Sequence, residues 1–112
     1  MVMLMYLERV DRLEVAVKGV IMEPKIKPDR LLEVTMRVLA EENRLESLLE
    51  KAKTALERQK LEEALKRIKG LKKSLLRVYF SSAILGSFKP EYIPAITALG
   101  RRRVWLPLEP RK

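Results

Sequence analysis

The residues of this sequence whose types and spacing could do chemistry are cations in its second half. Lys66, Lys69, Lys73 and Arg77 follow one another at steps of three or four residues. On a helix with 100° per residue, these steps gather the four side chains within an arc of about 80° along roughly 17 Å. No acidic residue occurs between Lys66 and Arg77, although solvated helix faces usually alternate Glu with Lys. Such an uncompensated row suits a phosphate backbone, and a merely solvated helix face is the alternative.

A second group of candidate residues lies near the C-terminus, where three arginines stand beside the single tryptophan. These residues are Arg101, Arg102, Arg103 and Trp105. Guanidinium groups can grip phosphates, and an indole can stack on a base. Alternatively, Trp105 and its apolar neighbours dock this segment onto a helix or a second subunit. We favour anion contact for the arginines and docking for Trp105.

Catalytic and metal-binding residues are scarce. The sequence has no Cys and no His, which excludes thiolate and imidazole metal sites, cysteine nucleophiles and His-dependent triads. The paired carboxylates Glu41–Glu42 and Glu62–Glu63 point about 100° apart on a helix, and no histidine completes a metal motif with them. We interpret both pairs as surface charges. The sequence therefore predicts no enzymatic activity, no metal and no cofactor.

The elements that must position these cations are helices, because apolar residues recur at steps of three and four. One helix is expected from Leu4 to Ile21, and the two prolines of residues 23–28 then form a connector. A second helix starts with Asp29 as its cap or with Pro28 in its first turn. Its apolar positions, like those of the following stretch, resemble a coiled-coil seam: Leu31, Val34, Val38, Leu45, Leu48, Ala52 and Ala55, and then Leu61, Leu65, Ile68, Leu71, Leu75 and Val78.

The register of this seam slips by one residue between Leu56 and Leu61, and three explanations are open. The slip marks a hairpin turn, a stutter in one long helix, or an earlier break at residues 41–44. Thr54–Glu57 has the form of a capping box, which favours a hairpin whose second arm starts near Thr54. A continuous helix over residues 29–86 would be about 85 Å long and would bury its stripe only in an oligomer.

Helix-breaking residues end the seam near Gly86–Pro90. A short helix over about residues 91–99 follows, with Gly100 as its C-terminal cap. Residues 101–112 contain two prolines and are expected to form an extended basic tail. The predicted fold is all-α: a helical bundle or a long antiparallel hairpin with coiled-coil-like packing. Residues 1–100 form one helical domain, and residues 101–112 form the tail.

Composition and charge limit the class of protein. The chain has 112 residues, of which 47% are hydrophobic and 35% charged, so it can bury a core. Its single Asn and single Gln, with abundant Lys, Glu and Arg, are typical of thermophilic proteins. No stretch has the pattern of an export signal or a membrane span, so we expect a cytoplasmic protein or one held within a nucleoprotein particle. Residues 1–50 carry 8 basic and 10 acidic residues, a net charge of −2, whereas residues 51–112 carry 16 and 5, a net charge of +11.

This charge asymmetry leads to the functional hypothesis. We expect a non-enzymatic protein that binds DNA or RNA through the phosphate backbone, as an architectural or packaging protein or as a ribonucleoprotein component. The alternative is a helical scaffold or adaptor whose positive half meets an acidic protein surface. A homo-oligomer is expected on either hypothesis. Attachment to an anionic membrane is disfavoured, because the apolar residues opposite the cations form a seam suited to protein packing.

Overall fold

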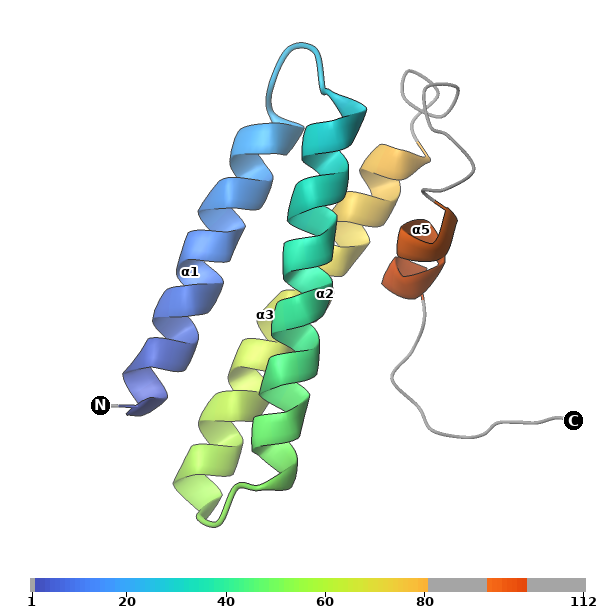
Figure 1. Ribbon diagram of the computed structural model, residues 1–112. Coiled ribbons are helices and arrows are strands. Elements are labelled where there is room, and N and C mark those ends of the chain that lie inside the picture. The colour runs from blue at the N-terminus through green and yellow to red at the C-terminus, as the bar shows by residue number, and fades with distance from the viewer. Residues whose placement is uncertain (1, 81–92, 101–112) are drawn as a thin grey trace, which may run out of the picture.

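The computed structural model describes residues 2–80 and 93–100 of the chain. Over these residues every regular element is a helix and no strand occurs, which confirms the all-α prediction. The elements are α1 (Val2–Ile21), α2 (Pro28–Glu50), α3 (Ala55–Tyr79) and α5 (Ile93–Gly100). Figure 1 shows the three long helices side by side with alternating directions, and each packs against the other two.

Helix α1 confirms the first expected helix, and one of its faces is apolar. This face holds Tyr6, Val10, Leu13, Val17 and Val20, which recur at steps of four and three and are all buried. A stripe with this period gives a helix a single face to bury, and the packing of that face contributes most of the stability of such a helix. The helix is followed by a connector that contains Pro24, as predicted.

Helix α2 begins with Pro28 in its first turn and Lys27 as its N-cap, so the alternative with Asp29 as the cap is wrong. Proline is favourable there because the first helical N–H groups have no intrahelical acceptor and the proline ring presets φ. The helix then runs through residues 41–44 without interruption, which excludes the predicted break at Asn43. No Gly or Pro occurs there, and the flanking Val38 and Leu45 are both fully buried.

A tight turn at residues 51–54 joins α2 to α3, which confirms the hairpin and contradicts the single long helix. The Thr54 hydroxyl accepts a hydrogen bond from the Glu57 N–H at 3.1 Å. The Glu57 carboxylate in turn accepts one from the Lys53 N–H at 3.3 Å. These contacts satisfy N–H groups that would otherwise be unpaired at the start of α3. The described part of α3 ends at Tyr79, and the end predicted near Gly86 lies outside the described residues.

The core lies between the three long helices and contains most of the predicted seam. The buried seam residues are Leu31, Val34, Val38 and Leu45 of α2, and Leu61, Leu65, Ile68, Leu71 and Leu75 of α3. They pack with the stripe of α1 in the same cluster. The hairpin thus buries these apolar residues within one chain, and they are not available for packing against a second copy. The homo-oligomer stays a prediction.

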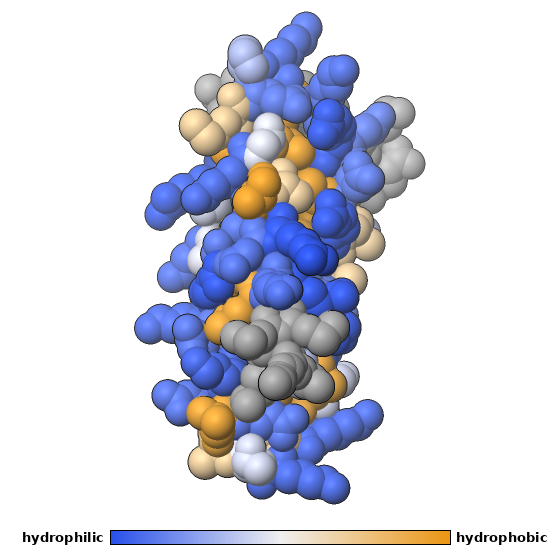
Figure 2. Space-filling model, turned by 90° about the vertical axis from the view of Figure 1, so that its left-hand side faces the viewer, coloured by the Kyte–Doolittle hydropathy of each residue, from blue (hydrophilic) through white to orange (hydrophobic). Residues whose placement is uncertain are grey.

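Helix α5 packs against α2 and α3 and buries Ala95 and Leu99. It corresponds to the short helix expected before residue 100, and it includes Gly100 as its last residue. Among the described residues, no helix combines the length and the apolar character needed to cross a bilayer. Figure 2 shows a largely hydrophilic face on which hydrophobic side chains appear as separate patches.

Candidate functional site

The four cations singled out on α3 are all exposed, and we call them the basic ridge: Lys66, Lys69, Lys73 and Arg77. The buried residues of α3 include Leu61, Ile68 and Leu75, which lie on the opposite side of the helix. Within the described part of the chain, no ion pair involves any of the four. The structure therefore brings these four residues together as one solvent-facing row.

The other cations in the middle of α3 are paired with the acidic N-terminal half. Arg67 contacts α1, where its guanidinium donates to Glu14 at 2.6 Å and also to Asp11. These hydrogen bonds, to Glu14 first and then Asp11, raise the pKa of Arg67. Lys72 contacts α2, where its ammonium group lies 2.9 Å from Glu42. The ion pairs within the chain thus neutralise Arg67 and Lys72, which face the other helices, and do not include the residues of the basic ridge.

Two acidic residues do lie beside the first half of the basic ridge. Lys66 and Lys69 line a shallow hollow of about 410 Å³ between α2 and α3, together with Glu46 and Glu62. Lys73 and Arg77 are not among the residues that line it. The positive potential of the basic ridge is therefore expected to be strongest toward Arg77.

Glu41 and Glu42 are not surface charges, so that prediction is wrong. Their exposed fractions are 7% and 6%. Ionised carboxylates tolerate such burial only with counter-charges and hydrogen bonds. Glu42 has Lys72, and Glu41 accepts hydrogen bonds from both Arg9 and Arg44 at 3.0 Å. In contrast, Glu62 and Glu63 are exposed, as predicted.

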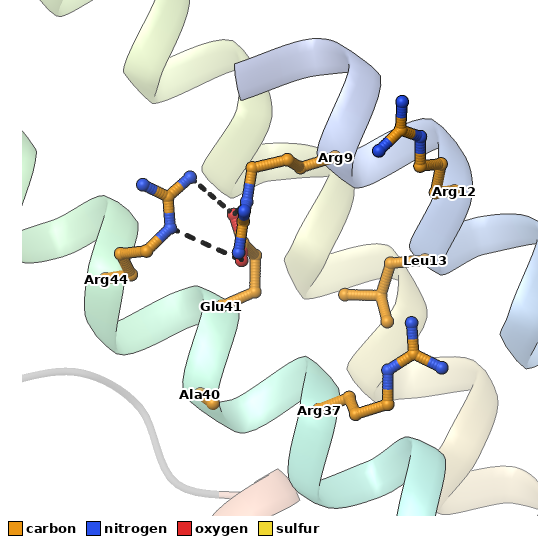
Figure 3. A pocket seen from close by; sticks show the side chains of 7 residues that line it. All are labelled: Arg9, Arg12, Leu13, Arg37, Ala40, Glu41 and Arg44. Atoms are coloured by element: carbon orange, nitrogen blue, oxygen red, sulfur yellow. Dashed lines mark hydrogen bonds and ion pairs between the residues drawn. The ribbon is translucent and has the colours of Figure 1, made fainter. Parts of the chain in front are cut away.

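A second positive site, which the sequence did not reveal, lies where α1 and α2 meet. This arginine pocket has a volume of about 350 Å³ and is lined by Arg9, Arg12, Leu13, Arg37, Ala40, Glu41 and Arg44. Figure 3 shows the Arg9 and Arg44 guanidiniums on either side of the Glu41 carboxylate. Arg12 and Arg37 are exposed and take part in no ion pair among the described residues. The pocket therefore holds four arginines and one carboxylate, and two of these arginines are paired with the carboxylate.

Glu41 is the carboxylate whose pKa the structure shifts most clearly. Burial raises its pKa, but hydrogen bonds from Arg9 and Arg44 and the charges of both arginines outweigh burial, so the pKa lies below its ordinary value. The same hydrogen bonds raise the pKa of Arg9. A carboxylate whose pKa is lower in the folded than in the unfolded state stabilises the fold above its unfolded pKa. That stability is lost as the pH falls toward the folded pKa.

We therefore expect the variant Glu41→Gln to lose about 1–2 kcal/mol of unfolding free energy at pH 7, since both arginines are partly exposed and screened by water. The loss should shrink as the pH falls below the ordinary pKa of a glutamate, because the unfolded wild-type chain then takes up a proton that the folded Glu41 carboxylate takes up only at a lower pH. Urea denaturation at pH 7, 5, 4 and 3 measures both effects. A difference between the two proteins that stays constant over this range would contradict the role given to the Glu41 charge.

The remaining candidates, Arg101, Arg102, Arg103 and Trp105, lie outside the described residues, as does the predicted tail. Among the described residues, no cluster of acidic side chains is suited to hold a metal ion. No protein-family model matches the chain, and the searches of curated proteins and of solved structures found no similar protein.

Proposed function

We propose that the protein binds nucleic acid through the phosphate backbone, with little dependence on sequence, and that the basic ridge makes the contacts. It would act by binding and not by catalysis, as an architectural or packaging protein or as part of a ribonucleoprotein. The observation that carries the proposal is selective pairing on α3. Arg67 and Lys72 are neutralised by α1 and α2, while four neighbouring cations face solvent together.

The dimensions of the basic ridge support phosphate as its ligand. Eleven residues separate Lys66 from Arg77, which is roughly 17 Å of helix. A DNA duplex presents about ten phosphate charges over that length, so four flexible cations can each reach one. Such contacts gain free energy by releasing condensed counterions and read no base edges, which explains why sequence tolerance is expected. Arg101, Arg102 and Arg103 would add further phosphate contacts, with Trp105 beside them.

The decisive experiment measures the affinity for a fluorescent duplex and for single-stranded RNA by anisotropy between 50 and 300 mM salt. The test variant is K66Q/K69Q/K73Q/R77Q, because glutamine keeps the helix propensity of lysine and removes the charge. If four phosphates are neutralised, the slope of log affinity against log salt should become shallower by about 3.6 for the duplex. Duplexes of scrambled sequence should bind with affinities within a factor of about three.

A matched control removes the same total charge from dispersed positions. Lys18, Lys25, Lys51 and Lys53 are exposed, have no ion pair among the described residues and lie on α1, the connector and the hairpin turn. The control variant K18Q/K25Q/K51Q/K53Q should keep a slope within about one of the wild-type value. Equal slopes for the two variants would refute a specific role of the basic ridge. Tight binding to polyglutamate without binding to DNA or RNA would favour the adaptor hypothesis.

A further inference from the structure

The arginine pocket at the α1–α2 junction is a site that the basic ridge does not explain. Its charge is strongly unbalanced, because Glu41 is the single acidic side chain among its lining residues. Glu41 also fixes two of the guanidiniums, since its two carboxylate oxygens each accept a hydrogen bond from a different arginine at 3.0 Å. Arg12 lies on α1 and Arg37 on α2, at opposite walls of the pocket (Figure 3), and both are exposed and have no ion pair among the described residues.

Guanidinium groups in this arrangement are suited to a phosphate. Each offers a planar fork of N–H donors that matches two phosphate oxygens, and it stays charged at any physiological pH. We propose that the arginine pocket binds a phosphate group of a nucleic-acid backbone. Arg12 and Arg37 make the direct contacts, and Glu41 holds Arg9 and Arg44 in place as flanking charges.

The position of the arginine pocket gives this site a distinct role. Helix α3 packs against both α1 and α2, and its ribbon passes behind the pocket in Figure 3. The basic ridge lies on the solvent side of α3, away from the core that α3 shares with α1 and α2. The two positive surfaces therefore lie on different sides of the bundle formed by the three long helices. One chain can hold two nucleic-acid segments, one on each surface.

Repulsion between two such segments does not prevent this arrangement. Each helix with its side chains is about 10–12 Å across, and the Debye length at 0.1 M salt is about 10 Å. Two segments on different faces of the packed helices are thus separated by at least one screening length. The bridging role rests on the proposed function, because the basic ridge must hold the other segment.

A sandwich assay tests the bridge with the full chain. A biotinylated duplex is immobilised, the protein is bound to it, and retention of a second, fluorescent duplex is measured at 100 mM salt. The wild-type protein should retain the fluorescent duplex. The variant R12Q/R37Q should still bind the immobilised duplex but retain about tenfold less of the fluorescent one, since two charge-assisted contacts are lost. The control variant K18Q/K51Q, with the same charge change on exposed lysines, should retain it like the wild type.

A second experiment measures phosphate binding at the arginine pocket in the absence of nucleic acid. Inorganic pyrophosphate should shift the arginine side-chain NMR signals of the wild-type protein, and R12Q/R37Q should lose those shifts. Circular dichroism checks the fold of each variant. If the helicity of R12Q/R37Q is lower than that of the wild type, the variant R12K/R37K is used in its place. It should retain about tenfold less fluorescent duplex than the wild-type protein, because lysine lacks the planar fork of donors.

The possible outcomes separate the two proposals. Full retention of the fluorescent duplex by R12Q/R37Q overturns the proposal that the arginine pocket holds the second duplex. A dimer that holds one duplex on each of its two basic ridges would give this result. An unchanged salt slope in K66Q/K69Q/K73Q/R77Q refutes the proposed function, whatever pyrophosphate does at the arginine pocket. Absence of pyrophosphate-induced shifts in the wild-type protein overturns the phosphate site itself.

Discussion

Replacing Lys72 by methionine is expected to lower the free energy of unfolding by about 3–5 kcal/mol. The Lys72 and Glu42 side chains are only 8% and 7% exposed, and their charged groups are 2.9 Å apart. Methionine keeps most of the lysine volume but removes the ammonium group. The Glu42 carboxylate then stays buried without this counter-charge and must be protonated or hydrated at the expense of the fold. Urea denaturation followed by circular dichroism measures the loss.

The double variant Glu42→Leu/Lys72→Met is the control for this interpretation. Replacing both charges by apolar side chains of similar size is often neutral or stabilising, so the double variant should be more stable than Lys72→Met alone. Lys72→Met should also leave the salt dependence of nucleic-acid binding unchanged, because Lys72 is not part of the basic ridge. A cost below about 1 kcal/mol for Lys72→Met would mean that water solvates Glu42 easily.

The second large effect is expected at Tyr79, where truncation to alanine should cost about 3–5 kcal/mol. Tyr79 is fully buried near the end of α3, and its hydroxyl lies 2.8 Å from the Thr35 hydroxyl of α2. The Thr35 hydroxyl is also 2.8 Å from the Leu31 carbonyl oxygen. Alanine would leave a cavity between the helices and remove the hydrogen bond with Thr35. Thermal and urea unfolding of the variant measure the cost.

Tyr79→Phe separates the two contributions to this effect. It keeps the ring in the core and removes only the hydroxyl, so it should cost about 1 kcal/mol. Burial raises the pKa of Tyr79, with the hydrogen bond to Thr35 acting in the opposite direction, so the hydroxyl stays neutral at physiological pH. Equal losses for the alanine and phenylalanine variants would contradict a packing role for the ring.

Much of the fold could be predicted from the sequence because its helices depend on local patterns. The steps of three and four in α1 and the cap at Thr54 are signals within a few residues of the elements they define. The capping box at Thr54 also favoured a hairpin over one long helix, a choice for which apolar periodicity alone gave no signal. The basic ridge was predictable for the same reason, since its geometry depends on a single helix.

The buried ion pair between Glu42 and Lys72 could also have been predicted from the apolar periodicity of the sequence. Glu42 lies between Val38 and Leu45 at steps of four and three, so it occupies a position of the apolar stripe. Lys72 stands in the corresponding place on α3, between Ile68 and Leu75. Two opposite charges within the stripes of adjacent helices predict a buried pair, because either charge alone would be costly there.

The arginine pocket could not be predicted in this way. Arg9 and Arg12 belong to α1, whereas Arg37 and Arg44 belong to α2, and the N-terminal half that contains them has a net negative charge. Their meeting depends on the register between the two helices. That register is set by side-chain packing across the core and not by any local signal.

The hairpin between α2 and α3 has a consequence for the thermodynamics of recognition. Because the apolar stripe of α3 is already buried against its own chain, the helix does not have to fold upon a ligand. In the proposed complex with nucleic acid, the cations of the basic ridge would be preorganised, so binding would be spared the conformational entropy that a disordered basic segment loses when it becomes ordered. The main unfavourable contribution to such binding would be the immobilisation of a few long side chains, and the heat-capacity change of complex formation should be correspondingly small.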